Sequence, residues 1–440
     1  MTINLPIELG DGLLLRWGRP EDADMLADFN VHVHSDNPQE LNHWIGHWTK
    51  DLMSGKHPTT SASDFTIVEN RATGEIVSSL CLISQQWMYE DVVFGVGRPE
   101  IVGTHPDYRR RGLVRLQMEA VHAKSAARGE LVQGITGIPW YYRKFGYEMG
   151  LNLGGYRVYP LPHAPGKKQN EARPTYTMRE ATLADLPVLK TLYARFCEGS
   201  LVSAVRDDAI WHYELTEMHP ETVFKPHLFL IFEGDTAVAY ADLSRYKATL
   251  SIRQIATIPG HSLRAAALFV LEQLKEKAFA INASDDPYPI EHINFYLGEE
   301  HPVYQALERE LRIAYHPYAW YVRVPDLPAF LRHITPVLER RLANSVMAGH
   351  SGTLRLNFYT SHLTLVFERG KLAEVGSYEP KSLDDGDGRF PDLTFLQLLF
   401  GYRSLDELDH ARADCYVNNE TAVLLKILFP KKPSWIEGIG

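Results

Sequence analysis

Short apolar runs, separated by polar turns and by one long amphipathic segment, organise the first third of the chain. Apolar runs that predict β-strands lie at 13–16, 65–68, 76–82, 98–104 and 130–136. A helix is expected to begin at Pro20, where acidic residues follow in the first turn, and an amphipathic helix is expected at 115–128. This order of hairpin, strand, helix and strand predicts a mixed sheet that is flanked by helices.

A second segment repeats this order of elements. Arg16 and Asp22 have the same spacing as Arg179 and Asp185, and each pair lies where a predicted strand turns into a predicted helix. Strands are then expected at 227–232, 237–241 and 250–255, and an amphipathic helix at 263–277. We therefore expect a second unit with the fold of the first. The proline-rich stretch 160–174 between the two units is typical of a linker.

A third unit is expected after another proline-rich junction near Pro325. Its predicted elements are a helix at 330–343, strands at 354–358, 363–367 and 371–375, and a buried helix at 393–401. The predicted division of the chain is 1–159, a linker at 160–174, 175–324 and 325–440. The fold class is therefore α+β, with two similar mixed-sheet units followed by a smaller α/β unit.

Composition and charge disfavour several classes of function. The 440 residues include 45 Lys and Arg against 55 Asp and Glu, a net charge of −10 that repels phosphate backbones and mildly favours cationic partners. The cysteines Cys81, Cys197 and Cys415 are far apart, so we expect neither a disulfide framework nor a metal site. An apolar run of about 18 residues and a basic, apolar leader are both absent, so we expect a cytoplasmic protein without a membrane span.

The segment 102–114 carries the most specific chemistry in the chain. An apolar strand ends at Thr104, a turn follows at Pro106, and a triple-arginine stretch before Gly112 leads into the predicted helix. A helix that begins in this way presents unpaired N–H groups, and with the guanidinium groups these suit a pyrophosphate. The alternatives are a solvated basic helix start and a patch for nucleic acid.

The pattern Arg109-x-x-Gly112-x-Val114 resembles motif A of the GNAT acetyltransferases, with Val114 in place of the usual Gly or Ala. Its triple-arginine form is similar to the enhanced intracellular survival (Eis) branch of N-acetyltransferases. The resemblance implies that acetyl-CoA is the co-substrate and that the first unit is the catalytic GNAT domain. The residues implied to contact the coenzyme are Val102, Thr104, Arg109, Arg110, Gly112, Leu113 and Gly137.

The order of the three units is also similar to that of Eis-like chains. The resemblance implies tandem GNAT-like domains and a C-terminal domain that resembles sterol carrier protein type 2. The second unit has no Arg-x-x-Gly signature in its loop at 259–267, so we expect that it does not bind CoA. The same resemblance implies assembly into a homo-hexamer.

Acetyl transfer to an amine needs an acid for the leaving thiolate and a base for the amine. The segment 142–147 resembles the Tyr-x-x-Phe-Gly-Tyr segment of Eis-like enzymes, which implies that Tyr142 is the general acid. Tyr141 would point elsewhere on a helix, and a packing role is the alternative for Tyr142. By the same resemblance the base is the terminal carboxylate, here that of Gly440, with Glu437 as the alternative.

An acceptor pocket with aromatic walls is expected between the first helix and the first hairpin. Trp44 and Trp48 would line this pocket, and Asp24 and Asp36 would receive a cationic acceptor. His43 and His47 have the i, i+4 spacing of a metal pair, but neither an HExxH pattern nor a third ligand is indicated.

Two classes of function follow from these residues. The first is an acetyl-CoA-dependent N-acetyltransferase that acts by direct attack of an amine of an aminoglycoside, a polyamine or a lysine side chain. The second is a non-catalytic carrier or scaffold that binds a lipid or CoA.

Overall fold

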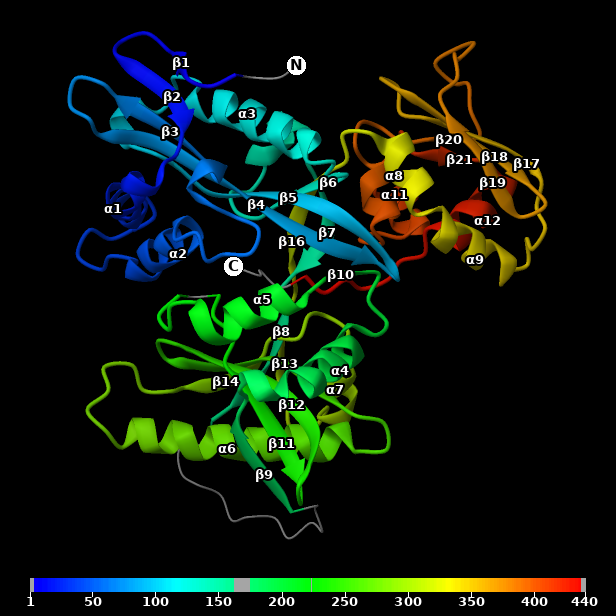
Figure 1. Ribbon diagram of the computed structural model, residues 1–440. Coiled ribbons are helices and arrows are strands. Elements are labelled where there is room, and N and C mark those ends of the chain that lie inside the picture. The colour runs from blue at the N-terminus through cyan, green and yellow to red at the C-terminus, as the bar shows by residue number, and fades with distance from the viewer. Residues whose placement is uncertain (1–3, 162–174, 223, 437–440) are drawn as a thin grey trace.

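The computed structural model describes residues 4–161, 175–222 and 224–436. Within these residues the strands form three sheets of nine, seven and five strands, and helices pack on each sheet (Figure 1). The first sheet lies above the second in Figure 1, and the third lies beside the first. The predicted α+β class is confirmed.

The first sheet is mixed, because β5 and β6 run parallel while its other neighbouring strands are antiparallel. Its strands in spatial order are β1 (Ile7–Glu8), β2 (Leu13–Trp17), β3 (Phe65–Asn70), β4 (Ile76–Tyr89), β5 (Val92–Thr104), β6 (Val132–Ile135), β16 (Tyr318–Arg323) and β7 (Glu148–Leu153), and β10 (Val202–Ala204) pairs with β4. Its helices are α1 (Ala23–Val33), α2 (His43–Met53) and α3 (Leu113–Ala127).

Alternation along β4 divides its side chains between two helical layers. Leu80 packs with Met118 of α3, and the next residue, Cys81, packs in the cluster that contains Leu26 of α1 and Leu52 of α2. All of these side chains are fully buried. The mostly apolar segment 76–82 that predicted this strand therefore reflects helices on both of its faces.

The second sheet has the same kind of order. Its strands are β15 (Ile313–Tyr315), β8 (Tyr156–Pro160), β14 (His292–Phe295), β13 (Thr249–Thr257), β12 (Thr236–Tyr246), β11 (Leu228–Glu233) and β9 (Tyr176–Glu180). Here β13 and β14 form the parallel pair. Its helices are α4 (Leu186–Cys197), α5 (Asp208–His212), α6 (Leu263–Asn282) and α7 (Pro302–Ala306).

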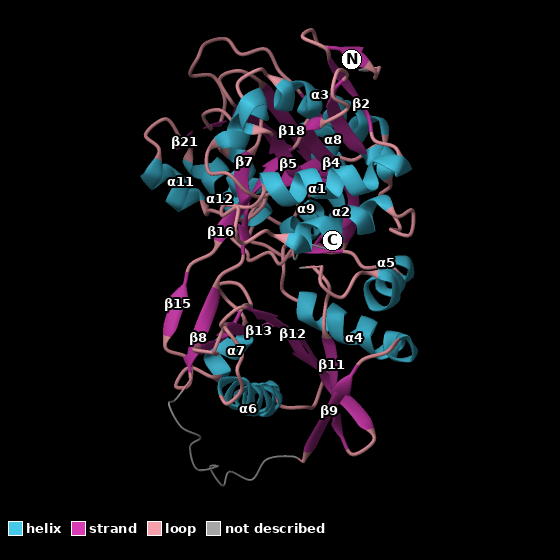
Figure 2. Ribbon diagram, turned by 90° about the vertical axis from the view of Figure 1, so that its left-hand side faces the viewer, coloured by secondary structure: helices cyan, strands magenta, loops and turns pink. Residues whose placement is uncertain are grey.

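The two sheets exchange one strand each. Strand β16, which follows the second sheet in sequence, lies between β6 and β7 of the first sheet. Strand β8, which precedes the other strands of the second sheet in sequence, lies in the corresponding place between β14 and β15, and Figure 2 shows it beside β15. The predicted boundary after residue 159 thus cuts through β8, and β16 lies outside the sheet of its predicted domain. An alternating pattern identifies a strand but not the sheet in which it pairs.

The repeated arginine–aspartate spacing produces the same ion pair in both units. Arg16 donates two hydrogen bonds to Asp22 (2.7 and 2.8 Å), and Arg179 donates two to Asp185 (2.8 and 2.7 Å). Each aspartate also accepts a backbone N–H three residues earlier at 2.8 Å, which begins a helical turn. The Arg179 hydrogen bonds hold the pKa of Asp185 well below its usual value. The pair therefore ties β2 to the start of α1 in the first unit and β9 to the start of α4 in the second.

The third sheet has the order β19 (Lys371–Gly376), β18 (His362–Glu368), β17 (Gly352–Asn357), β20 (Gly388–Arg389) and β21 (Tyr416–Val417). Its helices are α8 (Leu327–His333), α9 (Thr335–Ala343), α10 (Phe395–Leu399), α11 (Leu405–Ala411) and α12 (Asn419–Leu428). The single helix predicted at 330–343 is wrong, because it is divided before Thr335, where Pro336 begins a new helix.

The third unit shares an apolar core with the first. Phe330 of α8 packs edge to face against Phe94 of β5, with 5.3 Å between ring centroids, and against Tyr89 of β4 at 6.1 Å. Phe400 packs beside Phe330 at 5.5 Å. The rings are buried, so the two units are held by a continuous hydrophobic contact.

No helix of the described part of the chain has the length and apolar character that crossing a bilayer requires.

Candidate active site

An irregularity in β5 opens the first sheet at its centre. Between the pairs Ser79–Gly103 and Cys81–Glu100, two residues of β5 lie opposite Leu80 alone. One of them, Ile101, has a φ of 52°, so the strand carries a β-bulge there. The parallel pairing of β5 with β6 has already ended at Gly97. A bulge frees backbone N–H and C=O groups from the ladder, and here it does so where two parallel strands separate.

The loop after β5 delivers a helix N-terminus to the same place. The short helix η3 (Pro106–Tyr108) follows β5, and Gly112 (φ 78°) is the N-cap of α3. The first hydrogen bond of the helix runs from the Leu116 N–H to the Gly112 carbonyl at 3.3 Å, so the preceding amides have no acceptor within the helix. Positive φ at both Arg110 (65°) and Gly112 gives the loop its tight curvature.

A cavity of about 750 Å³, called here the basic cavity, lies in front of these groups. Six of the seven coenzyme residues expected from the sequence line it: Val102, Thr104, Arg109, Arg110, Gly112 and Leu113. Arg115 and Lys144 also line it, whereas its described lining contains no acidic side chain. Four cations and a helix N-terminus therefore face one space, which suits a ligand with several negative charges.

The third arginine of the triplet has a different role. A terminal nitrogen of Arg111 lies 3.6 Å from Asp11, and its guanidinium stands 5.0 Å from the ring centroid of Tyr108. Arg111 is not part of the cavity lining. The guanidinium of Arg109, in contrast, donates to the Thr104 carbonyl at 3.3 Å, which holds it at the end of β5.

His34, which sequence reasoning did not select, also lines the basic cavity. Its Nε2 is buried and has no hydrogen-bond partner among the described residues. That nitrogen would lie 3.3 Å from a β-carbon added to Gly103, so it stands against the β5 wall of the cavity. Burial lowers the pKa of His34, which keeps the ring neutral near pH 7. A neutral ring with a free nitrogen can hydrogen-bond a bound ligand.

The two predicted tyrosine neighbours occupy different environments on the short helix η4 (Tyr141–Phe145). Tyr142 is 3% exposed and packs against Tyr147 and Tyr321. Burial, with the nearby Glu100 carboxyl, raises its pKa well above the usual value for tyrosine. Tyr141 lines the basic cavity, and burial also raises its pKa. Both phenols therefore stay protonated at neutral pH, as a general acid must.

Gly137 lies just after β6 and directly beside the hydroxyl group of Tyr142. It follows β6 and has a φ of 121°, a conformation that other residues rarely adopt. A β-carbon at this position would lie 3.7 Å from the Tyr142 hydroxyl oxygen. Gly137 is not among the residues that line the basic cavity. Its missing side chain leaves space beside the hydroxyl group of Tyr142.

The candidate bases Gly440 and Glu437 lie outside the described residues, but the chain that leads to them is firmly held. We call residues 431–436 the C-terminal segment. It runs beside β10: the Leu201 N–H donates to the Pro433 carbonyl (2.7 Å), the Val202 N–H to the Ser434 hydroxyl (3.1 Å) and the Trp435 N–H to the Val202 carbonyl (2.9 Å). The segment thus extends the first sheet beyond β10.

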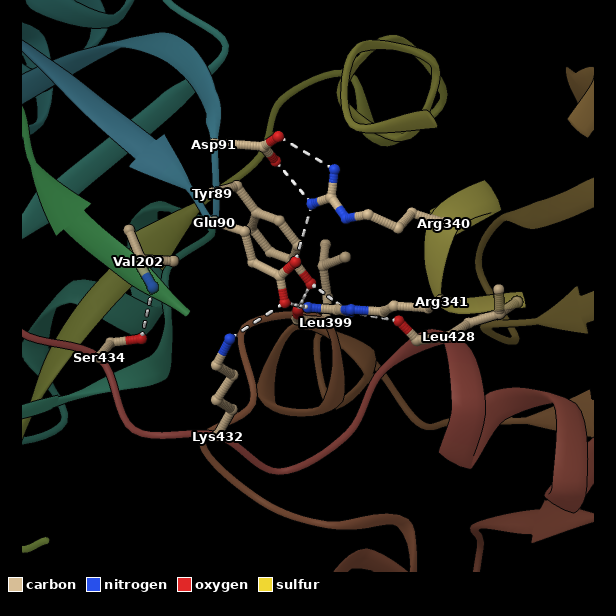
Figure 3. Close-up of polar contacts among 10 residues, drawn as sticks. All are labelled: Tyr89, Glu90, Asp91, Val202, Arg340, Arg341, Leu399, Leu428, Lys432 and Ser434. Atoms are coloured by element: carbon tan, nitrogen blue, oxygen red, sulfur yellow. Dashed lines mark hydrogen bonds and ion pairs between the residues drawn. The ribbon is translucent and has the colours of Figure 1, made fainter. Parts of the chain in front are cut away.

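A partly buried ion network anchors the start of this segment (Figure 3). The ammonium of Lys432 lies 3.1 Å from Glu90 on the β4–β5 turn, and Arg341 and Arg340 of α9 approach the same carboxylate to 2.8 and 3.0 Å. Arg340 also pairs with Asp91 at 2.6 Å. Burial alone would raise the pKa of Glu90, but the hydrogen bonds from these three cations outweigh it and lower the pKa to about 2. The network joins the first unit, the third unit and the C-terminal segment.

The structure does not gather the four expected acceptor residues into one pocket. Asp24 is exposed and pairs with Lys50 at 2.6 Å, and Asp36 is exposed. Trp48 is 3% exposed and belongs to the core between α1, α2 and the sheet. Trp44 lines a separate cavity together with Lys225 and Tyr246.

One group of potential metal ligands occurs among the described residues, and it includes only one of the two histidines that have metal-pair spacing in the sequence. Ligand atoms of His47, His219 and Glu221 lie within 4.8 Å of one another. The two imidazole rings, however, are stacked at 3.9 Å, and Nδ1 of His219 already accepts the Glu221 N–H at 3.2 Å. His43 is not part of the group. We assign no metal function to it.

Comparison with known proteins agrees with this geometry. Residues 24–150 match the family model of an acetyltransferase (GNAT) domain. No curated protein matches the chain. The match covers β3 to β6, the bulge and the basic cavity. The protein is an acetyltransferase with a GNAT domain in its first unit.

Solved structures resemble the chain over almost its whole length. A GCN5-related N-acetyltransferase from Anabaena variabilis has a TM-score of 0.65 at 13% identity, covering 96% of this chain and 99% of its own. A probable N-acyltransferase from Enterococcus faecalis has a TM-score of 0.68 at 15% identity, with coverages of 97% and 99%. Eis1 from Mycobacterium abscessus has a TM-score of 0.57 at 13% identity, with coverages of 96% and 99%. At these identities the likeness concerns the fold.

Proposed function

We propose that the protein is an acetyl-CoA-dependent N-acetyltransferase that transfers the acetyl group directly to a primary amine. The observation that carries this proposal is the basic cavity, in which four cations and the N-terminus of α3 lie beside a bulged strand. The pyrophosphate of the coenzyme would lie on the α3 N-terminus, and its extended arm would run along Val102 and Thr104 toward the bulge.

In the proposed reaction the amine nitrogen attacks the thioester carbonyl, so that a C–N bond forms and the C–S bond breaks. A backbone N–H at the bulge near Ile101 would stabilise the oxyanion that develops. The leaving thiolate would take a proton from Tyr142, whose raised pKa keeps the phenol protonated, and Gly137 leaves room for the approach. No covalent enzyme intermediate is required.

The amine must lose a proton to react. We propose the terminal carboxylate of Gly440 as the base, with Glu437 as the alternative. The hydrogen bonds that hold Pro433, Ser434 and Trp435 beside β10 support this role, because they determine where the last residues of the chain begin. The acceptor is the amine of an aminoglycoside, a polyamine or a lysine side chain. The proposal includes a cytoplasmic homo-hexamer.

The test is the release of free coenzyme thiol from acetyl-CoA in the presence of an aminoglycoside, a polyamine and a lysine peptide. Mass spectrometry should show that one of these amines gains an acetyl group while the protein mass stays unchanged. An acetylated protein intermediate, or thiol release that needs no amine, would contradict direct transfer.

A further inference from the structure

The second sheet has a cavity in the place that corresponds to the basic cavity of the first. The basic cavity lies between the end of α1, the end of β5, the start of α3 and the segment after β6. The second cavity, of about 360 Å³, lies between the end of α4, the end of β13, the start of α6 and the segment after β14. These four elements take the places in the second unit that α1, β5, α3 and β6 take in the first. The two units of similar fold therefore each contain a cavity at this position.

The charge of the second cavity is opposite to that of the first. Its lining carries Glu198, Glu299 and Glu300 against one arginine, Arg195, which pairs with Glu198. The helix N-terminus is also closed, because the hydroxyl group of Ser262 accepts the Ala265 N–H at 3.1 Å. A polyanion such as a pyrophosphate is therefore disfavoured, and a cation is favoured.

Aromatic rings form the inner wall of this cavity. Trp435 of the C-terminal segment packs edge to face on Phe196, with 5.6 Å between centroids, and His301 lies 5.7 Å from Phe196. Gly298 makes room for the indole: a β-carbon there would be 3.1 Å from Cζ3 of Trp435. Aromatic faces attract ammonium groups and stack on sugar rings.

Trp435 is only partly buried, so part of its indole ring remains accessible. Its Nε1 is buried and has no hydrogen-bond partner among the described residues. A buried donor without an acceptor is energetically unfavourable. A ligand with a hydroxylated ring and an ammonium group can stack on the aromatic wall and pair with the carboxylates.

We propose that the second cavity binds a small hydroxylated amine, an amino sugar or amino alcohol, with its ammonium group toward Glu299 and Glu300 and its ring against Trp435. This site is separate from the basic cavity, and the proposal does not rest on acetyl transfer. Because Trp435 also donates its backbone N–H to Val202, a bound ligand stabilises the docked C-terminal segment. The second unit would thus bind an amine at the place that corresponds to the basic cavity of the first unit.

The experiment uses the whole protein labelled with 5-fluorotryptophan, in the absence of acetyl-CoA. The chain has 8 tryptophans, and the ¹⁹F resonance of Trp435 is the one that W435F lacks. D-glucosamine, at a pH where its amine is protonated, should shift this resonance until it saturates. N-acetyl-D-glucosamine, which has the same ring without the charge, should bind about tenfold more weakly or not at all.

The variant E299Q/E300Q should weaken glucosamine binding about tenfold, since it removes two carboxylates from the rim. The matched control E374Q/E379Q removes two exposed carboxylates from the third unit and should leave binding unchanged. A Trp435 resonance that does not move with millimolar glucosamine overturns the proposal. An equal shift of this resonance with both sugars also overturns the proposal. So does equal glucosamine affinity in the wild type and in E299Q/E300Q. Coenzyme binding, measured separately by calorimetry, tests the proposed acetyl transfer on its own.

Discussion

Tyr141 and Tyr142 pack edge to face, with ring centroids 5.3 Å apart and planes at 83°, but of the two only Tyr141 lines the basic cavity. Tyr142 lies in the core behind Gly137, where its hydroxyl group meets the space that a side chain would otherwise fill. Two adjacent phenols thus offer a matched pair in which one serves as the control for the other.

Substitution Y142F should lower kcat about a hundredfold while leaving the KM for acetyl-CoA unchanged, because Tyr142 does not line the basic cavity and donates its proton only as the thiolate leaves. Y141F should lower kcat less than about threefold. Steady-state kinetics on both variants decide the assignment. A larger loss in Y141F would transfer the role of acid to Tyr141.

His34 should contribute to coenzyme affinity. The variant H34A removes a neutral ring nitrogen from the wall of the basic cavity, so we expect the Kd for CoA to rise about fivefold, the value of one hydrogen bond. H32A, on the same helix but with an exposed ring that bonds the Asp28 carbonyl at 2.8 Å, is the control. Equal Kd values for H34A and the wild type in calorimetry would exclude this contact.

The C-terminal segment should matter for turnover through Lys432. Because K432M removes the ion pair with Glu90, the segment loses one of its anchors beside the hydrogen bonds to Leu201 and Val202, and kcat should fall about tenfold with an unchanged Kd for CoA. The adjacent Lys431 pairs with Glu407 at 2.8 Å and is more exposed, so K431M is the matched control. If both variants turn over at the wild-type rate, the tail has no part in the reaction.

Acid should destabilise the first unit through His122. Its Nε2 lies 2.7 Å from the Tyr147 hydroxyl oxygen, and burial, with a smaller effect of Arg323, lowers its pKa from 6.5 to about 3. Between these two pKa values His122 is protonated in the unfolded chain but neutral in the folded chain. Its contribution to the free energy of unfolding is therefore fully present above pH 6.5 and is lost as the pH falls toward 3. Between pH 7 and 5 this loss is about 2 kcal/mol.

The variant H122Q, which does not titrate, should show a correspondingly flatter decline in the free energy of unfolding over this interval. Urea titrations at the two pH values measure it. Parallel declines in H122Q and the wild type would show that other groups cause the acid sensitivity.

Much of the fold could be predicted from local patterns. The loop at 102–114 has its strand, turn and helix in the expected order, since glycine, proline and the apolar run act over a few residues. The Arg16–Asp22 and Arg179–Asp185 spacing correctly indicated a repeated unit. The exchange of β8 and β16 could not be predicted, because it depends on pairing between segments more than 130 positions apart.

The parts of the site formed by backbone groups and by charged residues could be predicted from the sequence. The parts that depend on the direction of individual side chains could not. The different environments of Tyr141 and Tyr142, and the burial of Trp48, arise from tertiary packing that periodicity alone does not describe. His34 could have been suspected as a histidine at the end of the first helix, but its place beside Gly103 depends on how α1 crosses β5.

The central claim is that the basic cavity holds acetyl-CoA through its cations, and calorimetry of acetyl-CoA binding tests it most directly. The wild type should bind one molecule per chain, R109A/R115A should bind about a hundredfold more weakly, and R111A, altered outside the cavity, should bind as the wild type does. An absence of binding heat for the folded wild type, or an undiminished affinity in R109A/R115A, would contradict the account.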